Sequence, residues 1–156
     1  MWLLHPLSGA IVQPYEIDAT RCLSYLTIET RSGIAEEWRR AFDQRIYGCD
    51  ICQDVCPWNR HAATSGDPAW QPRDGLASPR LLDLCRLDDE AWRRVLDGSA
   101  MRRAGLRRIR RSLAYAAASL PNADAGGALD ALSAHPSSTF PEVASAIEWA
   151  RTQLGS

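Results

Sequence analysis

The stretch Cys49-Asp50-Ile51-Cys52-Gln53-Asp54-Val55-Cys56-Pro57 carries the most specific pattern in the chain. Cysteine thiolates are the usual ligands of iron–sulfur clusters, and the two-residue gap lets one tight turn direct two sulfurs at the same cluster. The three-residue gap places the sulfur of Cys56 about one helical turn further on, and Pro57 prevents the chain from continuing as a helix. Together with Cys22 upstream, the motif predicts ligands for a four-iron–four-sulfur cluster.

These cysteines could also be buried thiols in a helix, a redox dithiol, or ligands of a structural zinc ion, and the three alternatives stay open at this point. Structural zinc sites usually combine two Cys-x-x-Cys pairs, or one such pair with closely spaced histidines. The sequence has no second pair, and His61 and His135 lack a partner at such a spacing. We therefore favour the cluster over zinc.

The chain of 156 residues has the size of one ordinary domain, or of two small modules that share a core. Its five cysteines are odd in number and mostly clustered, unlike those of a secreted disulfide scaffold. No segment reaches the roughly 20 apolar residues of a membrane span, and the first residues lack the charged start of a signal peptide. These features predict a cytoplasmic redox protein with no membrane partner.

Composition divides the chain into three regions. Residues 1–60 hold the cysteine motif, residues 61–79 are broken by proline and glycine like a linker loop, and residues 80–156 show the periodicity of amphipathic helices. We expect a mainly α fold: a ferredoxin-like iron–sulfur segment, incomplete at its N-terminus, followed by a small HEAT-like helical domain. Helices are predicted over residues 18–29, 34–45, 80–87, 89–97, 99–120, 123–134 and from 140 onward.

The basic residues are all arginines, and they concentrate between positions 93 and 111. Four of them are predicted to share one helical face and could neutralise phosphates of a folded RNA. The alternative is a solvated face with no partner. The four are Arg103, Arg107, Arg110 and Arg111. The remaining cysteine, Cys85, is flanked by leucines and is predicted to be a packed core thiol.

Several stretches resemble the epoxyqueuosine reductase family. The two most specific are Arg21-Cys22-Leu23-Ser24-Tyr25-Leu26-Thr27-Ile28-Glu29 and Arg45-Ile46-Tyr47-Gly48-Cys49-Asp50-Ile51-Cys52-Gln53-Asp54-Val55-Cys56-Pro57-Trp58-Asn59. Upstream, Gly9-Ala10-Ile11-Val12-Gln13-Pro14-Tyr15 fits the same family, and downstream Gly98-Ser99-Ala100-Met101-Arg102-Arg103-Ala104 resembles the start of its HEAT-like helices. The resemblance therefore covers essentially the whole chain, in order.

The resemblance implies a tRNA-modifying oxidoreductase of queuosine biosynthesis. Such an enzyme reduces epoxyqueuosine in a tRNA anticodon stem-loop with cobalamin and two four-iron–four-sulfur clusters, and a cytoplasmic donor supplies the electrons. In the family, Cys22, Cys49 and Cys52 would share one cluster with an upstream cysteine, and Cys56 would complete the other. The positions expected to face the corrin are Ser24, Asp50 and Ile51.

The start of the chain departs from the family's pattern. A first cysteine motif should stand directly before Gly9, preceded by the cobalamin-binding domain, but the chain reads His5-Pro6-Leu7-Ser8. We expect the C-terminal part of such an enzyme, from a truncated or mispredicted reading frame, with His5 as a candidate substitute ligand. It should be a monomer that holds at most one cluster and binds cobalamin poorly. The alternative is a non-catalytic RNA-binding or interaction module with a decayed metal site.

Overall fold

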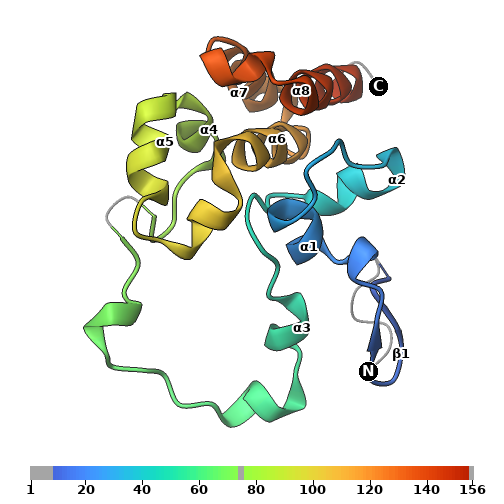
Figure 1. Ribbon diagram of the computed structural model, residues 1–156, viewed down its shortest axis with the longest axis vertical. Helices are drawn as coiled ribbons and strands as arrows, with labels where there is room; N and C mark the ends of the chain where they lie inside the picture. The colour runs from blue at the N-terminus through green and yellow to red at the C-terminus, as the bar shows by residue number, and fades with distance from the viewer. Residues whose placement is uncertain (1–8, 74–75, 155–156) are drawn as a thin grey trace.

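The computed structural model describes residues 9–73 and 76–154, and these are mostly helical (Figure 1). The strands in these residues are β1 (Ile11–Gln13) and β2 (Glu16–Ile17), which pair as an antiparallel hairpin. The predicted mainly α fold is thus confirmed. The candidate ligand His5 lies outside the described residues.

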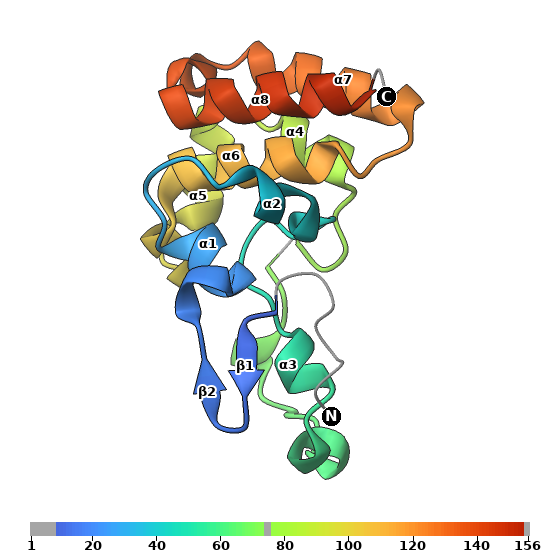
Figure 2. The same ribbon diagram turned by 90° about the vertical axis from the view of Figure 1, so that its right-hand side faces the viewer.

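The second half of the chain forms a helical bundle around one central helix. The helices α7 and α8 form a layer over the central helix α6, and α4 packs against α7 (Figures 1 and 2). None of the described helices is long and apolar enough to cross a membrane. The bundle consists of α4 (Leu81–Arg86), α5 (Asp89–Leu96), α6 (Gly105–Ala117), α7 (Asn122–Ser133) and α8 (Pro141–Leu154).

Local sequence explains where α5 and α6 begin. The side chain of Asp88 caps α5 by accepting a hydrogen bond from the backbone N–H of Ala91 at 2.7 Å. The helix predicted over residues 99–120 is interrupted, because a 3-10 turn, η5 (Ala100–Arg103), precedes α6. Gly105 then has a φ of +68°, a left-handed conformation that glycine adopts without steric cost.

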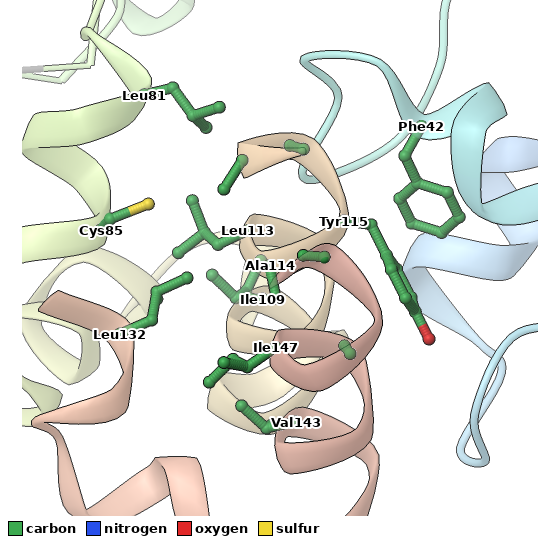
Figure 3. Packing of buried hydrophobic residues seen from close by; sticks show 14 of the residues in the cluster. Phe42, Leu81, Cys85, Ile109, Leu113, Ala114, Tyr115, Leu132, Val143 and Ile147 are labelled. Atoms are coloured by element: carbon green, nitrogen blue, oxygen red, sulfur yellow. The ribbon is translucent and has the colours of Figure 1, made fainter. Parts of the chain in front are cut away.

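The hydrophobic core surrounds α6, whose residues from Ile109 to Ala117 are all buried (Figure 3). Leu113, Leu132 and Ile147 bring α6, α7 and α8 together. Cys85 of α4 is fully buried in this core, which confirms the prediction of a packed thiol. Burial raises the pKa of Cys85 to about 12, because the thiolate form would lose its hydration.

The first part of the chain consists of short elements, some of which pack against the bundle. The helix predicted over residues 18–29 is divided at Cys22, where the backbone is extended. The ring of Phe42 meets Tyr115 of α6 edge to face, with centroids 5.1 Å apart, so the core continues into this part. The predicted division of the chain at residues 60 and 79 stays a prediction. The elements are η1 (Ala19–Arg21), α1 (Leu23–Ile28), α2 (Glu36–Arg39), η2 (Arg40–Phe42), α3 (Ile51–Asp54), η3 (Pro57–His61) and η4 (Pro68–Trp70).

The loop that joins the two parts follows a wide arc away from the bundle (Figure 1). It returns at Arg73, whose guanidinium donates hydrogen bonds of 2.7 Å to the carbonyls of Asp97 and Gly98. These carbonyls lie just after α5, where a cation is favourable because the helix end exposes unpaired acceptors.

Candidate iron–sulfur site

Three short elements bring four cysteines to the wall of one cavity. Cys22 stands directly before α1, Cys49 precedes α3, Cys52 lies within α3, and Cys56 stands directly before η3. Their cavity has a volume of about 500 Å³ and lies between the β1–β2 hairpin and α3. Much of the remaining wall is apolar, and it includes Ile11, Ile17, Leu23, Val55, Pro57 and Trp58. The four predicted ligands are therefore gathered at a single place.

Among the described residues, no group of three or more His, Cys, Asp or Glu side chains is placed to hold a metal ion. A cluster takes one thiolate at each of several separate iron atoms. The four cysteines that line this largely apolar cavity offer that number of thiolates.

The predicted corrin-facing positions are only partly assembled. Ile51 lines the cavity beside the cysteines. Ser24 is half-buried and Asp50 is exposed, and neither contributes to the cavity wall. The structure thus brings one of the three positions to the cysteines, and the corrin-facing role of all three stays a prediction.

The four arginines predicted to share an exposed face do not share one. The side chains of Arg103 and Arg107 are 71% and 60% exposed, whereas Arg110 and Arg111 are completely buried. The prediction of a common RNA-facing surface is therefore wrong for Arg110 and Arg111. The reason is that other elements cover both flanks of α6 in its middle, so Arg110 and Arg111 are enclosed.

Arg110 is bound on the flank formed by α4 and α5. Its guanidinium donates to the carbonyl of Leu87 at 2.6 Å and to the carboxylate of Asp89 at 2.9 Å. Burial alone would raise the pKa of Asp89, but hydrogen bonds from Ser137 and Arg110 outweigh it and hold that pKa below its ordinary value. The pKa of Arg110 itself is lowered by burial. This ion pair joins α6 to the start of α5, and Asp89 also accepts hydrogen bonds from Ser137 in the turn before α8.

Arg111 is bound on the opposite flank, where α1 ends. Its guanidinium donates to the carbonyls of Leu26, Thr30 and Ser32 at 2.5, 2.8 and 2.6 Å. Burial lowers the pKa of Arg111 to about 10, so the side chain stays charged at neutral pH. Arg111 therefore attaches the helix that begins after Cys22 to the bundle.

The two exposed arginines already have partners within the chain. Arg103 forms an ion pair with Glu29, and the hydrogen bond from Arg103 lowers the pKa of that carboxyl. The guanidinium of Arg107 lies 3.9 Å from the ring centroid of Phe140, a cation–π contact. Both side chains remain on the surface and are able to meet an anionic partner.

Sequence reasoning missed Thr27, which is fully buried close to the cysteines. Its hydroxyl accepts a hydrogen bond of 3.0 Å from the backbone N–H of Gly48, the residue before Cys49. A threonine inside a short helix that follows a ligand cysteine was the available signal. The spacing alone did not reveal its partner.

A family model described as a 4Fe-4S double cluster binding domain matches residues 8–59. Among curated proteins, the epoxyqueuosine reductase of Yersinia pestis is 47% identical over 117 residues, which are 75% of this chain and 28% of that protein. The epoxyqueuosine reductase of Pseudomonas aeruginosa is 39% identical over 148 residues, which are 95% of this chain and 40% of that protein. The chain thus spans well under half the length of these relatives.

Solved structures show the same likeness in three dimensions. The crystal structure of an epoxyqueuosine reductase with an epoxyqueuosine-modified tRNA-Tyr stem loop matches with a TM-score of 0.79 and 29% identity, covering 99% of this chain and 40% of that chain. The epoxyqueuosine reductase of Bacillus subtilis matches with a TM-score of 0.77 and 28% identity, covering 99% and 41%. The fold and the order of elements are therefore shared along nearly the whole of this chain.

Proposed function

Because this chain is related in sequence and in fold to the epoxyqueuosine reductases, as expected for their C-terminal part, we propose that it is the electron-relay and tRNA-docking portion of such a tRNA-modifying oxidoreductase. The observation that carries the proposal is the single cavity lined by Cys22, Cys49, Cys52 and Cys56. All four lie within the residues that match the double-cluster family model.

In this chain the four cysteines of the cavity would together hold one iron–sulfur cluster, whereas the family resemblance gives Cys56 to a second cluster. They offer enough thiolates for one four-iron–four-sulfur cluster, which supplies one-electron transfer when bound. The wall around that position is largely apolar, with Ile11 and Val55 among its residues, and apolar surroundings influence the redox potential of a metal site. An electron donor of the cytoplasm would reduce the cluster, and the chain would act as a monomer.

The RNA part of the proposal depends on the surface of the bundle. One of the similar structures contains a tRNA stem loop. Arg103 and Arg107 are exposed at the start of α6 and its preceding turn, where they would neutralise phosphates of an anticodon stem-loop. Arg110 and Arg111 take no part, because they are enclosed in the bundle.

The chain alone would not reduce epoxyqueuosine. Catalysis with cobalamin requires that the reactive atom of the cofactor be held against the substrate. Of the positions expected to face a corrin, only Ile51 lies at the cavity. We therefore expect weak cobalamin binding by this chain and no turnover.

Anaerobic reconstitution with iron and sulfide tests the cluster. We expect one cluster per chain, detected by iron and sulfide analysis and by a broad visible absorption band, and its loss in Cys49→Ala or Cys52→Ala. Cys85→Ala is the matched control, because this thiol is buried in the core away from the cavity. Stoichiometric zinc without iron in the wild-type chain would contradict the proposal, and so would equal cluster loss in all three variants.

A further inference from the structure

One buried hydroxyl connects two segments that carry predicted ligands. Thr27 lies in α1 and has no exposed surface. Its Oγ1 accepts a hydrogen bond of 3.0 Å from the backbone N–H of Gly48, which is 21 residues further along the chain. The same hydroxyl donates to the carbonyl of Leu23 at 2.9 Å, with the carbonyl of Ser24 at 3.1 Å.

The partners of Thr27 are close neighbours of cysteines in the cavity. Leu23 follows Cys22 directly, and Gly48 directly precedes Cys49. Gly48 has a φ of +67°, a left-handed conformation that glycine adopts readily, at the point where the chain enters the ligand loop. The hydroxyl of Thr27 therefore fixes the backbone next to two predicted ligands at once.

The helix that carries Thr27 is itself fixed to the bundle. Arg111 of α6 donates to the carbonyls of Leu26 and Thr30 at the end of α1. Leu23 and Leu26 are buried in the core that surrounds α6. The bundle is thus linked to the backbone beside Cys49 through α1 and the hydroxyl of Thr27.

We propose that Thr27 is a positioning residue for the cluster, because its hydroxyl holds the loop of Cys49 in place relative to the helix that begins after Cys22. The inference rests on the proposed function, since it requires a cluster in the cavity. Thr27 acts through the backbone of Gly48 and contacts no iron. Groups that orient metal ligands in this way commonly change metal affinity about tenfold or more when they are removed.

Thr27→Val and Thr27→Ser form the decisive pair of variants. Valine keeps the branched shape but loses the hydroxyl, which leaves the Gly48 N–H without its acceptor. Serine keeps the hydroxyl. After reconstitution, we expect Thr27→Val to lose its cluster to a chelator about tenfold faster than the wild type and to show a changed electron paramagnetic resonance spectrum of the reduced cluster. Thr27→Ser should retain the wild-type rate and spectrum.

Ser133→Ala is the matched control. The hydroxyl of Ser133 makes the same kind of bond, to the carbonyl of Leu129 four residues earlier at 2.8 Å, but it lies in α7 within the bundle. The Ser133→Ala substitution should change the melting temperature of the cluster-free chain without altering the spectrum of the cluster. Should the valine variant not fold, Thr27→Ala removes the same hydroxyl and takes its place.

The outcomes separate this inference from the proposed function. A wild-type rate and spectrum in the variant without the hydroxyl would overturn the positioning role. Equal changes in the valine and serine variants would also overturn it, since packing rather than the hydroxyl would then be responsible. Failure of the wild-type chain to take up iron would overturn the proposed function, and this inference with it.

Discussion

The bundle around α6 and the segment that carries the four cysteines are stabilised in different ways. In the bundle, the middle of α6 is completely buried, by apolar side chains around Leu113 and by polar partners around Arg110 and Arg111. In the cysteine segment, α3 is a four-residue helix and Tyr15 and Trp58 are largely exposed. Helices this short do not form on their own in water. The bundle therefore supplies the rigidity, and the cysteine segment supplies the ligands.

Two polar side chains attach the cysteine segment to the bundle. Arg111 binds the carbonyls at the end of α1, and Thr27 binds the backbone before Cys49. The cysteine segment contributes only part of the core. These few hydrogen bonds therefore have a large influence on where its cysteines lie. The comparison suggests three tests, in order of decreasing effect.

Thiol reactivity should separate the two regions most sharply. In the cluster-free chain at pH 8, Cys85 should react with a disulfide reagent at least about a thousandfold more slowly than Cys52, because its pKa of about 12 leaves little of the reactive thiolate. Cys52 is exposed, whereas Cys85 is fully buried. The absorbance of the thiolate that the reagent releases measures the fast reaction of Cys52 and the slow reaction of Cys85. Comparable rates for all five cysteines would show that the bundle opens as readily as the cysteine segment.

Replacement of Arg111 should weaken the attachment between the regions. Arg111→Met removes the guanidinium donor from the carbonyls of Leu26 and Ser32, whereas the carbonyl of Thr30 keeps Arg108 as a donor. We expect a loss of about 2 kcal/mol in the free energy of unfolding. Urea denaturation followed by circular dichroism provides the measurement. Arg94→Met is the control, because Arg94 is exposed and pairs with Glu90 on the same helix, where such a pair contributes about 0.5 kcal/mol or less. Equal losses in the two variants would contradict the role given to Arg111.

The smallest effect should come from the exposed arginines. Arg103→Gln combined with Arg107→Gln removes two surface charges, and glutamine preserves helix propensity. We expect weaker binding to an anticodon stem-loop and a plot of log affinity against log salt that is shallower by about 1.5. Fluorescence anisotropy over a range of salt concentrations measures both quantities. Arg86→Gln with Arg94→Gln provides a charge-matched control on other helices of the bundle. Identical binding by the two double variants would favour the solvated-face alternative.

Much of the local structure followed from the sequence. The cap at Asp88, the interruption of helix by proline and glycine, and the burial of Cys85 were predictable, since each depends on residues within a few positions. The order of helices was correct, although the helices predicted over residues 18–29, 34–45 and 99–120 are shorter than expected. Over residues 34–45 the structure has α2 followed by the 3-10 turn η2. Extended backbone at Cys22 and the left-handed Gly105 account for the other two differences.

The sequence by itself determined the chemistry: cysteines at a spacing typical of iron–sulfur ligands, and a helical region to support them. Only the tertiary structure decided which polar side chains face solvent. Arg107 and Arg111 are one turn apart on α6, yet the first is exposed and the second binds Thr30, which is 81 residues away in the chain. Helical periodicity describes one face of one helix, but burial depends on what the rest of the chain places against that face.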